Sequence, residues 1–264
     1  LESIVNVVAA GAALIATTVA ARPADESHPF GHTKAEFFSA LVEGALILFA
    51  AFAIVREAAS RLAQPEAIEA PGLGLLVSLA ASVANLLLAR YLINLGRQVR
   101  SPAVTADGHH VMADVVTSVG VLAGVGLAAV TGWWVLDPLL AVLVAGNILF
   151  VGWRLVSESA GGLMDAGVPV EDRSEITRAI LDSMAGAIEV HDIRTRRAGR
   201  RAFVDAHLVV PGDMTVSEAH RITDRIEVEV RRRVPGTSIT VHIEPDNEAQ
   251  GQYAELRAHW RKRR

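Results

Sequence analysis

Long apolar runs separated by polar connections fill the first 160 residues of the chain. Each run approaches or exceeds the ~20 residues that a helix needs to cross ~30 Å of hydrocarbon. The runs cover Leu1 to Ala21, Phe37 to Leu62, Leu73 to Leu95, Val111 to Val130 and Trp133 to Val156. The pattern therefore predicts an α-helical membrane bundle with five spans.

After Gly161 the pattern changes to charged, amphipathic segments that a bilayer would not accept. In chain order these segments predict a helix, two strands joined at Gly199, a second helix and a third strand. Thr215 and Glu218 form a capping box for the second helix. The first helix carries an apolar stripe at Ile176, Ile180 and Met184, and the strands are predicted at Val190 to Arg197, Ala202 to Val210 and Ser238 to Glu244. This order predicts a small α+β domain of ferredoxin-like type with an antiparallel sheet.

The two patterns predict the domain organisation of the chain. Residues 1–160 form the membrane domain, 161–169 a linker, 170–246 the soluble domain and 247–264 a charged tail. Arg97 and Arg100 favour the cytoplasmic side for the connection between the third and fourth runs, because basic residues are enriched in cytoplasmic loops, although Arg56 and Arg61 then lie near the opposite side. With alternating spans, residues 22–34 and the soluble half then also face the cytoplasm. Since the chain opens inside an apolar run without a basic leader, we expect a further span upstream.

Composition narrows the possible classes of partner. The chain is 51% hydrophobic, carries a net charge of -4 and contains no cysteine. The acidic balance disfavours a nucleic-acid partner. The absence of cysteine excludes disulfides and thiolate ligands, so any bound metal must use nitrogen and oxygen donors.

Two polar pairs inside the apolar runs are candidate ion ligands. His110 and Asp114 lie four residues apart, and Glu2 and Asn6 repeat that spacing in the first run. Residues four apart share one helix face, as two ligands of one ion must. Carboxylates in spanning helices are costly unless they are paired, hydrated or coordinated, so they mark ion pathways. The alternative is that each pair forms hydrogen bonds within the bundle.

Polar residues at the water edge suggest a second site. Asp25, His28 and His32 fall within eight residues of a loop, close enough to share a metal ion, although solvated loop histidines are the alternative interpretation. Asp107 and His109 precede the His110 pair and are interpreted as solvated entrance residues.

Histidines in the soluble half suggest a third site. His242 and Glu244 share one face of the last predicted strand, opposite its apolar residues. His207 on a neighbouring strand and His220 on the second helix can join them in a metal site. The alternative is that all four are polar residues on an exposed sheet face.

The order of several motifs resembles the cation diffusion facilitator family of metal-proton antiporters. The resemblance covers nearly the whole chain and rests on LESIVNVVAA, HPFGHTKAE, ADGHHVMADVVTSVGVL, LDPLLAVLVA, GGLMD, HDIRTRRAG and VHIEP. It implies a homodimer in the inner membrane with six spans in each protomer, the first absent from this sequence, and a cytoplasmic C-terminal domain.

The resemblance also implies roles for individual residues. It implies a transport site of Glu2, Asn6, His110 and Asp114, a loop site of Asp25, His28 and His32, and a cytoplasmic-domain site of His207, His220, His242 and Glu244. Lys34 and Asp165 match positions that pair to hold the dimer together. The chain departs from the family pattern at Glu2 and Asn6, where zinc and iron carriers show two aspartates, and at Glu244, where an aspartate is familiar.

These observations predict a transporter and no enzyme. It would export a divalent cation in exchange for protons, with Zn²⁺ as the first candidate and Mn²⁺, Fe²⁺, Co²⁺, Ni²⁺ and Cd²⁺ as alternatives. Its expected partners are a second copy of the chain, the lipid bilayer, metal ions and protons. The alternative class is a membrane-anchored metal sensor or scaffold that binds ions without moving them. A metallochaperone or RNA-binding module is disfavoured, since the chain lacks a CxxC pair and an aromatic sheet face.

Overall fold

The computed structural model describes residues 2–63 and 73–251, and of residues 2–6, 8, 73–78 and 129 the backbone alone. The chain divides into two compact units, Leu1–Leu163 and Met164–Arg264. The predicted charged tail lies largely outside the described residues.

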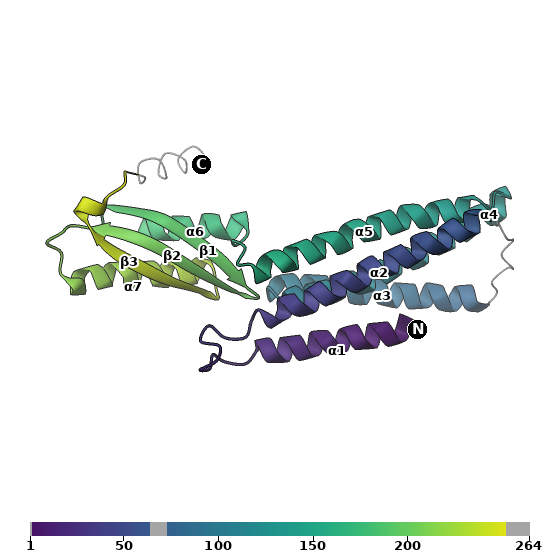
Figure 1. The fold of residues 1–264 in the computed structure, drawn as a ribbon, viewed down its shortest axis with the longest axis horizontal. Helices are drawn as coiled ribbons and strands as arrows, with labels where there is room; N and C mark the ends of the chain where they lie inside the picture. The colour runs from purple at the N-terminus through teal and green to yellow at the C-terminus, as the bar shows by residue number, and fades with distance from the viewer. Residues whose placement is uncertain (1, 64–72, 252–264) are drawn as a thin grey trace. The chain divides into compact units, whose positions relative to one another are not determined.

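The described residues of the first unit form five helices that run along one another (Figure 1). They are α1 (Glu2–Ala20), α2 (Ala35–Ala63), α3 (Leu73–Gln98), α4 (Pro102–Thr131) and α5 (Leu136–Leu163). The most extensive contacts join α2 with α5 and α3 with α4, while α4 also contacts α1, α2 and α5. The predicted helical bundle is therefore confirmed, with α4 at its centre.

The apolar runs predicted the helices better than they predicted the helix ends. The fourth helix begins at Pro102, nine residues before the predicted Val111. The Ser101 hydroxyl caps it by accepting from the Val104 amide at 3.3 Å, and proline suits the first helical position because its missing amide hydrogen would be unpaired there. Asp107 and His109 therefore lie within α4. The apolar pattern had placed them in the connection before this helix.

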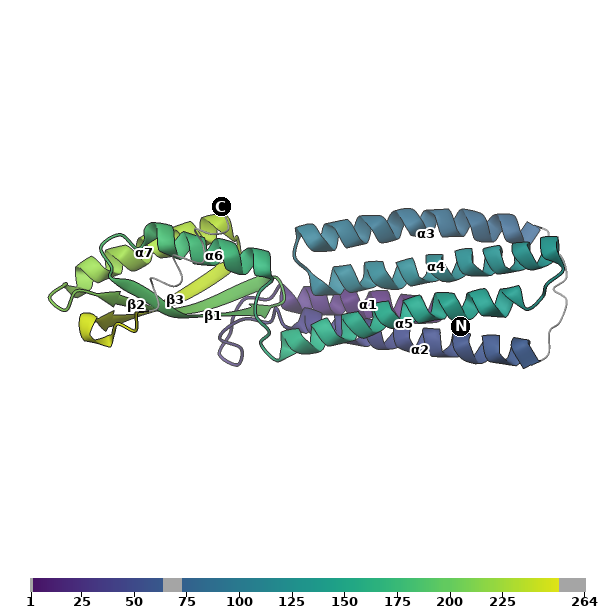
Figure 2. The same ribbon diagram turned by 90° about the horizontal axis from the view of Figure 1, so that it is seen from above.

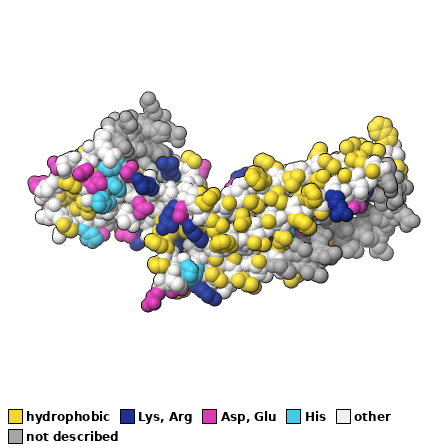
Figure 3. All heavy atoms as spheres, viewed as in Figure 1, with side chains coloured by type: hydrophobic (Ala, Val, Ile, Leu, Met, Phe, Trp, Pro, Cys, Tyr) yellow, Lys and Arg dark blue, Asp and Glu magenta, His cyan; other side chains and the backbone are white. Residues whose placement is uncertain are grey.

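Four of the described helices are long and apolar enough to cross a membrane, and α1 contributes a shorter apolar stretch at Ala9–Ala20. Many of their large apolar side chains are exposed on the outside of the bundle, where the space-filling view shows hydrophobic side chains along most of the visible face (Figure 3). Inside, a Cβ added to Gly120 would approach Val144 to 2.6 Å. Small residues therefore allow α4 and α5 to pack closely.

In the second unit, the described residues form a three-stranded sheet with two helices on one face (Figure 2). Its elements are α6 (Val170–Ser183), β1 (Glu189–Ala198), β2 (Arg201–Val210), α7 (Val216–Arg233) and β3 (Thr237–Pro245), followed by the short 3-10 helix η1 (Asp246–Glu248). The predicted capping box is present, since Thr215 and Glu218 bond each other's backbone amides. Apolar side chains of α6, α7 and alternate strand positions form the core, which leaves the other sheet face open.

The strand order is β1-β2-β3, and the prediction of an antiparallel sheet was wrong for its last pair. Strands β1 and β2 form an antiparallel hairpin, whereas β3 lies parallel to β2. The physical reason is the helix α7, which crosses over the sheet and returns the chain to the same end before β3 begins.

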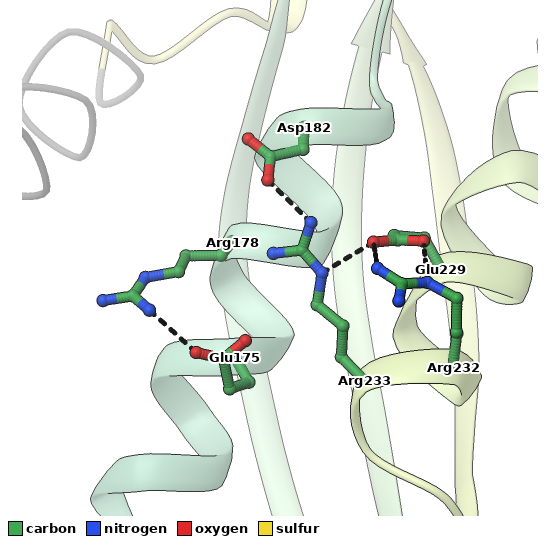
Figure 4. A network of polar contacts seen from close by, with 6 residues as sticks. All are labelled: Glu175, Arg178, Asp182, Glu229, Arg232 and Arg233. Carbon is green, nitrogen blue, oxygen red and sulfur yellow. Dashed lines mark hydrogen bonds and ion pairs between the residues drawn. The ribbon is translucent and has the colours of Figure 1, made fainter.

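Charged contacts join the two helices of the second unit (Figure 4). The Arg233 guanidinium of α7 contacts Asp182 of α6 at 2.8 Å and Glu229 of its own helix at 2.6 Å. Hydrogen bonds from Arg232 and Arg233 lower the pKa of Glu229 to about 2. Because this pKa lies below its ordinary value of 4.5, the pairing stabilises the fold above that value and is lost as the pH falls toward 2.

Candidate metal sites

The first candidate site lies inside the helical bundle. His110 and Asp114 lie one turn apart on α4, and His110 is only 6% exposed. Helix α1 contacts α4 and carries Glu2 and Asn6 in its first two turns. The side chains of Glu2 and Asn6 lie outside the described part of the chain, so their share in this site stays a proposal. The helix contacts are those that a site shared between α1 and α4 requires.

The second candidate site lies in the loop between α1 and α2. The structure brings Asp25, His28 and His32 together, with three potential ligand atoms within 4.8 Å of one another. Asp25 oxygens lie 3.4 Å from His28 Nδ1 and 3.3 Å from His32 Nε2. Hydrogen bonds from Ser27 and from the backbone of His28 lower the pKa of Asp25 to about 2. The carboxylate is therefore ionised at physiological pH, as a metal ligand must be.

The third candidate site lies on the open face of the sheet. The strand register aligns His191 of β1 with His207 of β2, and His207 with His242 of β3. Glu244 reaches two of these rings, with oxygens 3.1 Å from His191 Nε2 and 2.7 Å from His207 Nδ1. His191, His207 and Glu244 offer ligand atoms within 4.8 Å of one another. We call these three residues the sheet cluster.

His191 was not among the metal ligands predicted from the sequence, although it is the first residue of the motif HDIRTRRAG. A bulge in β1 follows His191, at Asp192 with a φ of 49°, and shifts the register of the strand against β2. Bulges of this kind redirect side chains near functional sites. A row of histidines across three strands becomes visible once the strand register is known.

The sheet cluster has the properties of a cation site. His191 is fully buried, and although carboxylate oxygens lie 3.1 Å from its Nε2 and 3.5 Å from its Nδ1, neither ring nitrogen forms a hydrogen bond of suitable geometry with the described residues, nor does Oε2 of Glu244. Buried polar atoms in this state are costly, and a cation between the imidazoles and the carboxylate would satisfy them. Figure 3 shows histidine and acidic side chains together on the surface of this unit. The residues present therefore fit a bound divalent metal ion.

The two other predicted residues of this site lie at different distances from the cluster. His242 is adjacent, with its Nε2 3.8 Å from Glu244 Oε1, and its side chain is 67% exposed. The structure does not bring His220 to the cluster, because His220 projects from the exposed side of α7, with its Nε2 3.6 Å from Asp224 of the same helix.

Glu189 contacts the sheet cluster at the ring nitrogen of His191 that does not face Glu244. Its Oε1 lies 3.5 Å from His191 Nδ1, and its carboxylate also accepts the backbone amides of Gln250 and Gly251. A metal-ligating histidine commonly turns its second ring nitrogen toward such a carboxylate, and loss of that partner costs ~10–100-fold in metal affinity.

We expect Glu189→Ala to weaken zinc binding at the sheet cluster by that factor, as measured by zinc titration. Glu189→Asp should weaken it less, and an unchanged affinity in both variants would contradict this role.

Lys34 and Asp165 belong to different units. The Lys34 ammonium donates to the Leu163 carbonyl at 3.3 Å, which ties the start of α2 to the end of α5. Asp165 accepts from Arg196 at 3.2 Å within the second unit. A contact between Lys34 and Asp165 themselves stays a prediction.

Four span-length apolar helices among the described residues and a small α+β domain define a multi-pass membrane protein, and histidine and carboxylate side chains of both units could bind divalent cations. The model of the cation efflux transmembrane domain matches residues 1–164, and that of the cation efflux protein cytoplasmic domain matches residues 168–246. The chain therefore belongs to the cation efflux, or cation diffusion facilitator, family of metal-cation transporters. The predicted family is confirmed, and the C-terminal domain is cytoplasmic.

Two relatives agree with this membership. The chain is 41% identical to an uncharacterized transporter of Synechocystis sp. over 93% of its own length and 79% of the relative. It is 32% identical to the cation-efflux pump FieF of Klebsiella pneumoniae over 93% of its length and 81% of that pump. The zinc form of the putative zinc transporter CzrB shares 44% identity, covering 33% of this chain and 98% of that structure with a TM-score of 0.31.

Proposed function

We propose that this protein exports a divalent transition-metal cation from the cytoplasm in exchange for protons, and that zinc is its main substrate. The observation that carries the proposal is the buried His110, one turn from Asp114 on the central helix α4. The two side chains offer an imidazole nitrogen and carboxylate oxygens inside an apolar bundle, where an ion pathway is the default explanation of such groups. Glu2 and Asn6 on α1 would complete a four-ligand set.

Proton exchange follows from the chemistry of these ligands. A metal ion binds neutral imidazole and ionised carboxylate, so an entering metal displaces protons and arriving protons displace the metal. Alternating exposure of one site to the two sides of the membrane then couples the two fluxes. The protein needs no covalent step, so we propose no enzymatic activity.

The loop site and the sheet cluster would act as regulators in a homodimer. Metal bound at the sheet cluster would stabilise the cytoplasmic domain and favour one arrangement of the two protomers, which shifts the transporter between its states. The loop site of Asp25, His28 and His32 stands at the end of α1 and the start of α2, next to the bundle.

Flux measurements in proteoliposomes test the proposal against the sensor alternative. With an imposed proton gradient, the full-length protein should accumulate Zn²⁺ against its concentration gradient, and an uncoupler should stop the accumulation. Zinc binding without flux in either direction would identify a sensor or scaffold. Metal flux that does not depend on the proton gradient would support a metal carrier and exclude exchange for protons.

Asn6 offers a test of metal selectivity. A neutral amide oxygen gives a bound ion one negative charge fewer than a carboxylate, and ligand type and geometry decide which divalent ion is held. We expect Asn6→Asp to shift the preference of the transporter toward zinc. Competition transport assays with zinc, manganese, iron, cobalt and nickel would measure the shift, and an unchanged order would place Asn6 outside the set of ligands.

A further inference from the structure

A buried carboxylate on α2 lies near the proposed transport site. Glu43 is fully buried, between Ala40 and Ile47 of the apolar cluster that joins α2, α4 and α5. One of its oxygens, Oε1, accepts from the Ser39 hydroxyl at 3.3 Å. The other, Oε2, has no hydrogen-bond partner among the described residues, and no ion pair of the described chain involves Glu43. The ionised form of a carboxylate buried in this way needs a counterion, and without one the group takes up a proton.

The charged neighbour of Glu43 is Asp107 on α4, a second carboxylate that cannot act as its counterion. It is half-buried, interacts electrostatically with Glu43, and itself interacts with His110. Asp107 and His110 lie three residues apart on α4, and therefore on neighbouring positions of one face. Among the side chains that the structure describes, Asp107 thus interacts with Glu43 and His110, and of these three groups only the imidazole can become positive.

Helix geometry places these groups at one level of the bundle. Helices α2 and α4 begin at the same end of the first unit (Figures 1 and 2). Glu43 follows the start of α2 by eight residues and His110 follows the start of α4 by eight, so each lies ~12 Å along its helix. Asp114 lies one turn deeper. The carboxylates of Glu43 and Asp107 therefore stand beside the first ligand of the proposed site.

We propose that Glu43 and Asp107 form a second cation-binding station, which holds a divalent metal ion through carboxylate oxygens and the Ser39 hydroxyl before it reaches His110 and Asp114. The unpartnered Oε2 of Glu43 points to this role, because a divalent cation supplies the missing counterion for both carboxylates. Oxygen ligands of this kind suit Mn²⁺ and similar hard ions, and also accept Zn²⁺. The inference rests on the proposed transport function, since it gives the transported ion a waiting position.

Carboxyl labelling tests the station independently of transport. The purified full-length protein with His110→Ala and Asp114→Ala, which removes the described ligands of the deeper site, is treated with dicyclohexylcarbodiimide with and without Mn²⁺, and labelled residues are quantified by mass spectrometry. At free Mn²⁺ about ten times its Kd, the labelling rate of Glu43 should fall about tenfold, because only the metal-free fraction reacts. Glu57, an exposed acid of the same helix paired with Arg61, is the internal control and should be unchanged.

Variants of the two carboxylates complete the test. Asp107→Asn should abolish the protection of Glu43 by Mn²⁺, whereas Glu57→Gln should leave it intact. Equal labelling of Glu43 with and without Mn²⁺ in the parent variant would overturn the proposal. If that variant does not purify as a monodisperse species, the same comparison with the deeper site intact decides, since protection must still depend on Asp107. If Mn²⁺ protects Glu43 but the wild type transports no metal, the export function is wrong and the second binding station is supported. If the wild type transports metal but Mn²⁺ does not protect Glu43, the export function is supported and the station is wrong.

Discussion

Asp114→Ala should abolish metal transport by the full-length protein while the protein still folds and purifies normally. The substitution removes an ionised ligand from α4 and only a few atoms of packing, and Asp114 is not among the fully buried side chains. A divalent cation held in an apolar bundle depends on carboxylate charge, so we expect the flux to fall to the level of protein-free vesicles. Zinc uptake into proteoliposomes under an inward or outward proton gradient provides the measurement.

His110→Ala separates ligand loss from proton coupling. We expect transport to fall strongly, and any residual flux to lose part of its dependence on pH between about 5 and 8, where imidazole ordinarily titrates. Glu57→Gln is the matched control, because it removes a carboxylate from the exposed side of the bundle and should leave flux unchanged. Wild-type rates in Asp114→Ala would show that the transport site lies elsewhere.

The second large effect concerns the sheet cluster. A ligand that binds only the folded state stabilises it by RT ln(1 + [L]/Kd), about 2.7 kcal/mol at ~100 times the Kd. The backbone amides of β1, β2 and β3 should therefore exchange hydrogen about 100-fold more slowly with zinc than without it, where exchange needs opening of the sheet. Hydrogen exchange of the full-length protein, followed by mass spectrometry, would show this protection locally.

Variants distinguish the members of the sheet cluster from their neighbours. His207→Ala should remove most of the zinc protection without unfolding the domain, because its side chain is 35% exposed and lies on the open face of the sheet. His242→Ala should have a smaller effect, since its ring is further from Glu244. His220→Ala is the control, because His220 pairs with Asp224 on the outside of α7. If zinc protects no amides of the sheet, the cluster is only a set of polar residues on an exposed face.

Local spacing accounts for most of the groupings that the sequence and the structure share. The apolar runs, the capping box at Thr215 and the His110 and Asp114 pair all depend on residues a few positions apart, whose relative placement a helix already determines. The loop site is similar, since Asp25, His28 and His32 are close in the chain and their meeting needs only a short turn. For these features the tertiary structure adds distances and burial to a grouping that the sequence already contains.

Only the tertiary structure decided how distant segments meet. His191 joins His207 because of strand register and a bulge at Asp192, neither of which leaves a periodic signal in the sequence. The crossover through α7 set β3 parallel to β2, and the cap at Ser101 started α4 earlier than its apolar run. Glu43 is visible as a carboxylate within an apolar run, yet its burial beside Asp107 depends on the contact between α2 and α4. Sequence periodicity determines which face an element buries, whereas the packing of elements determines which polar groups share that buried space.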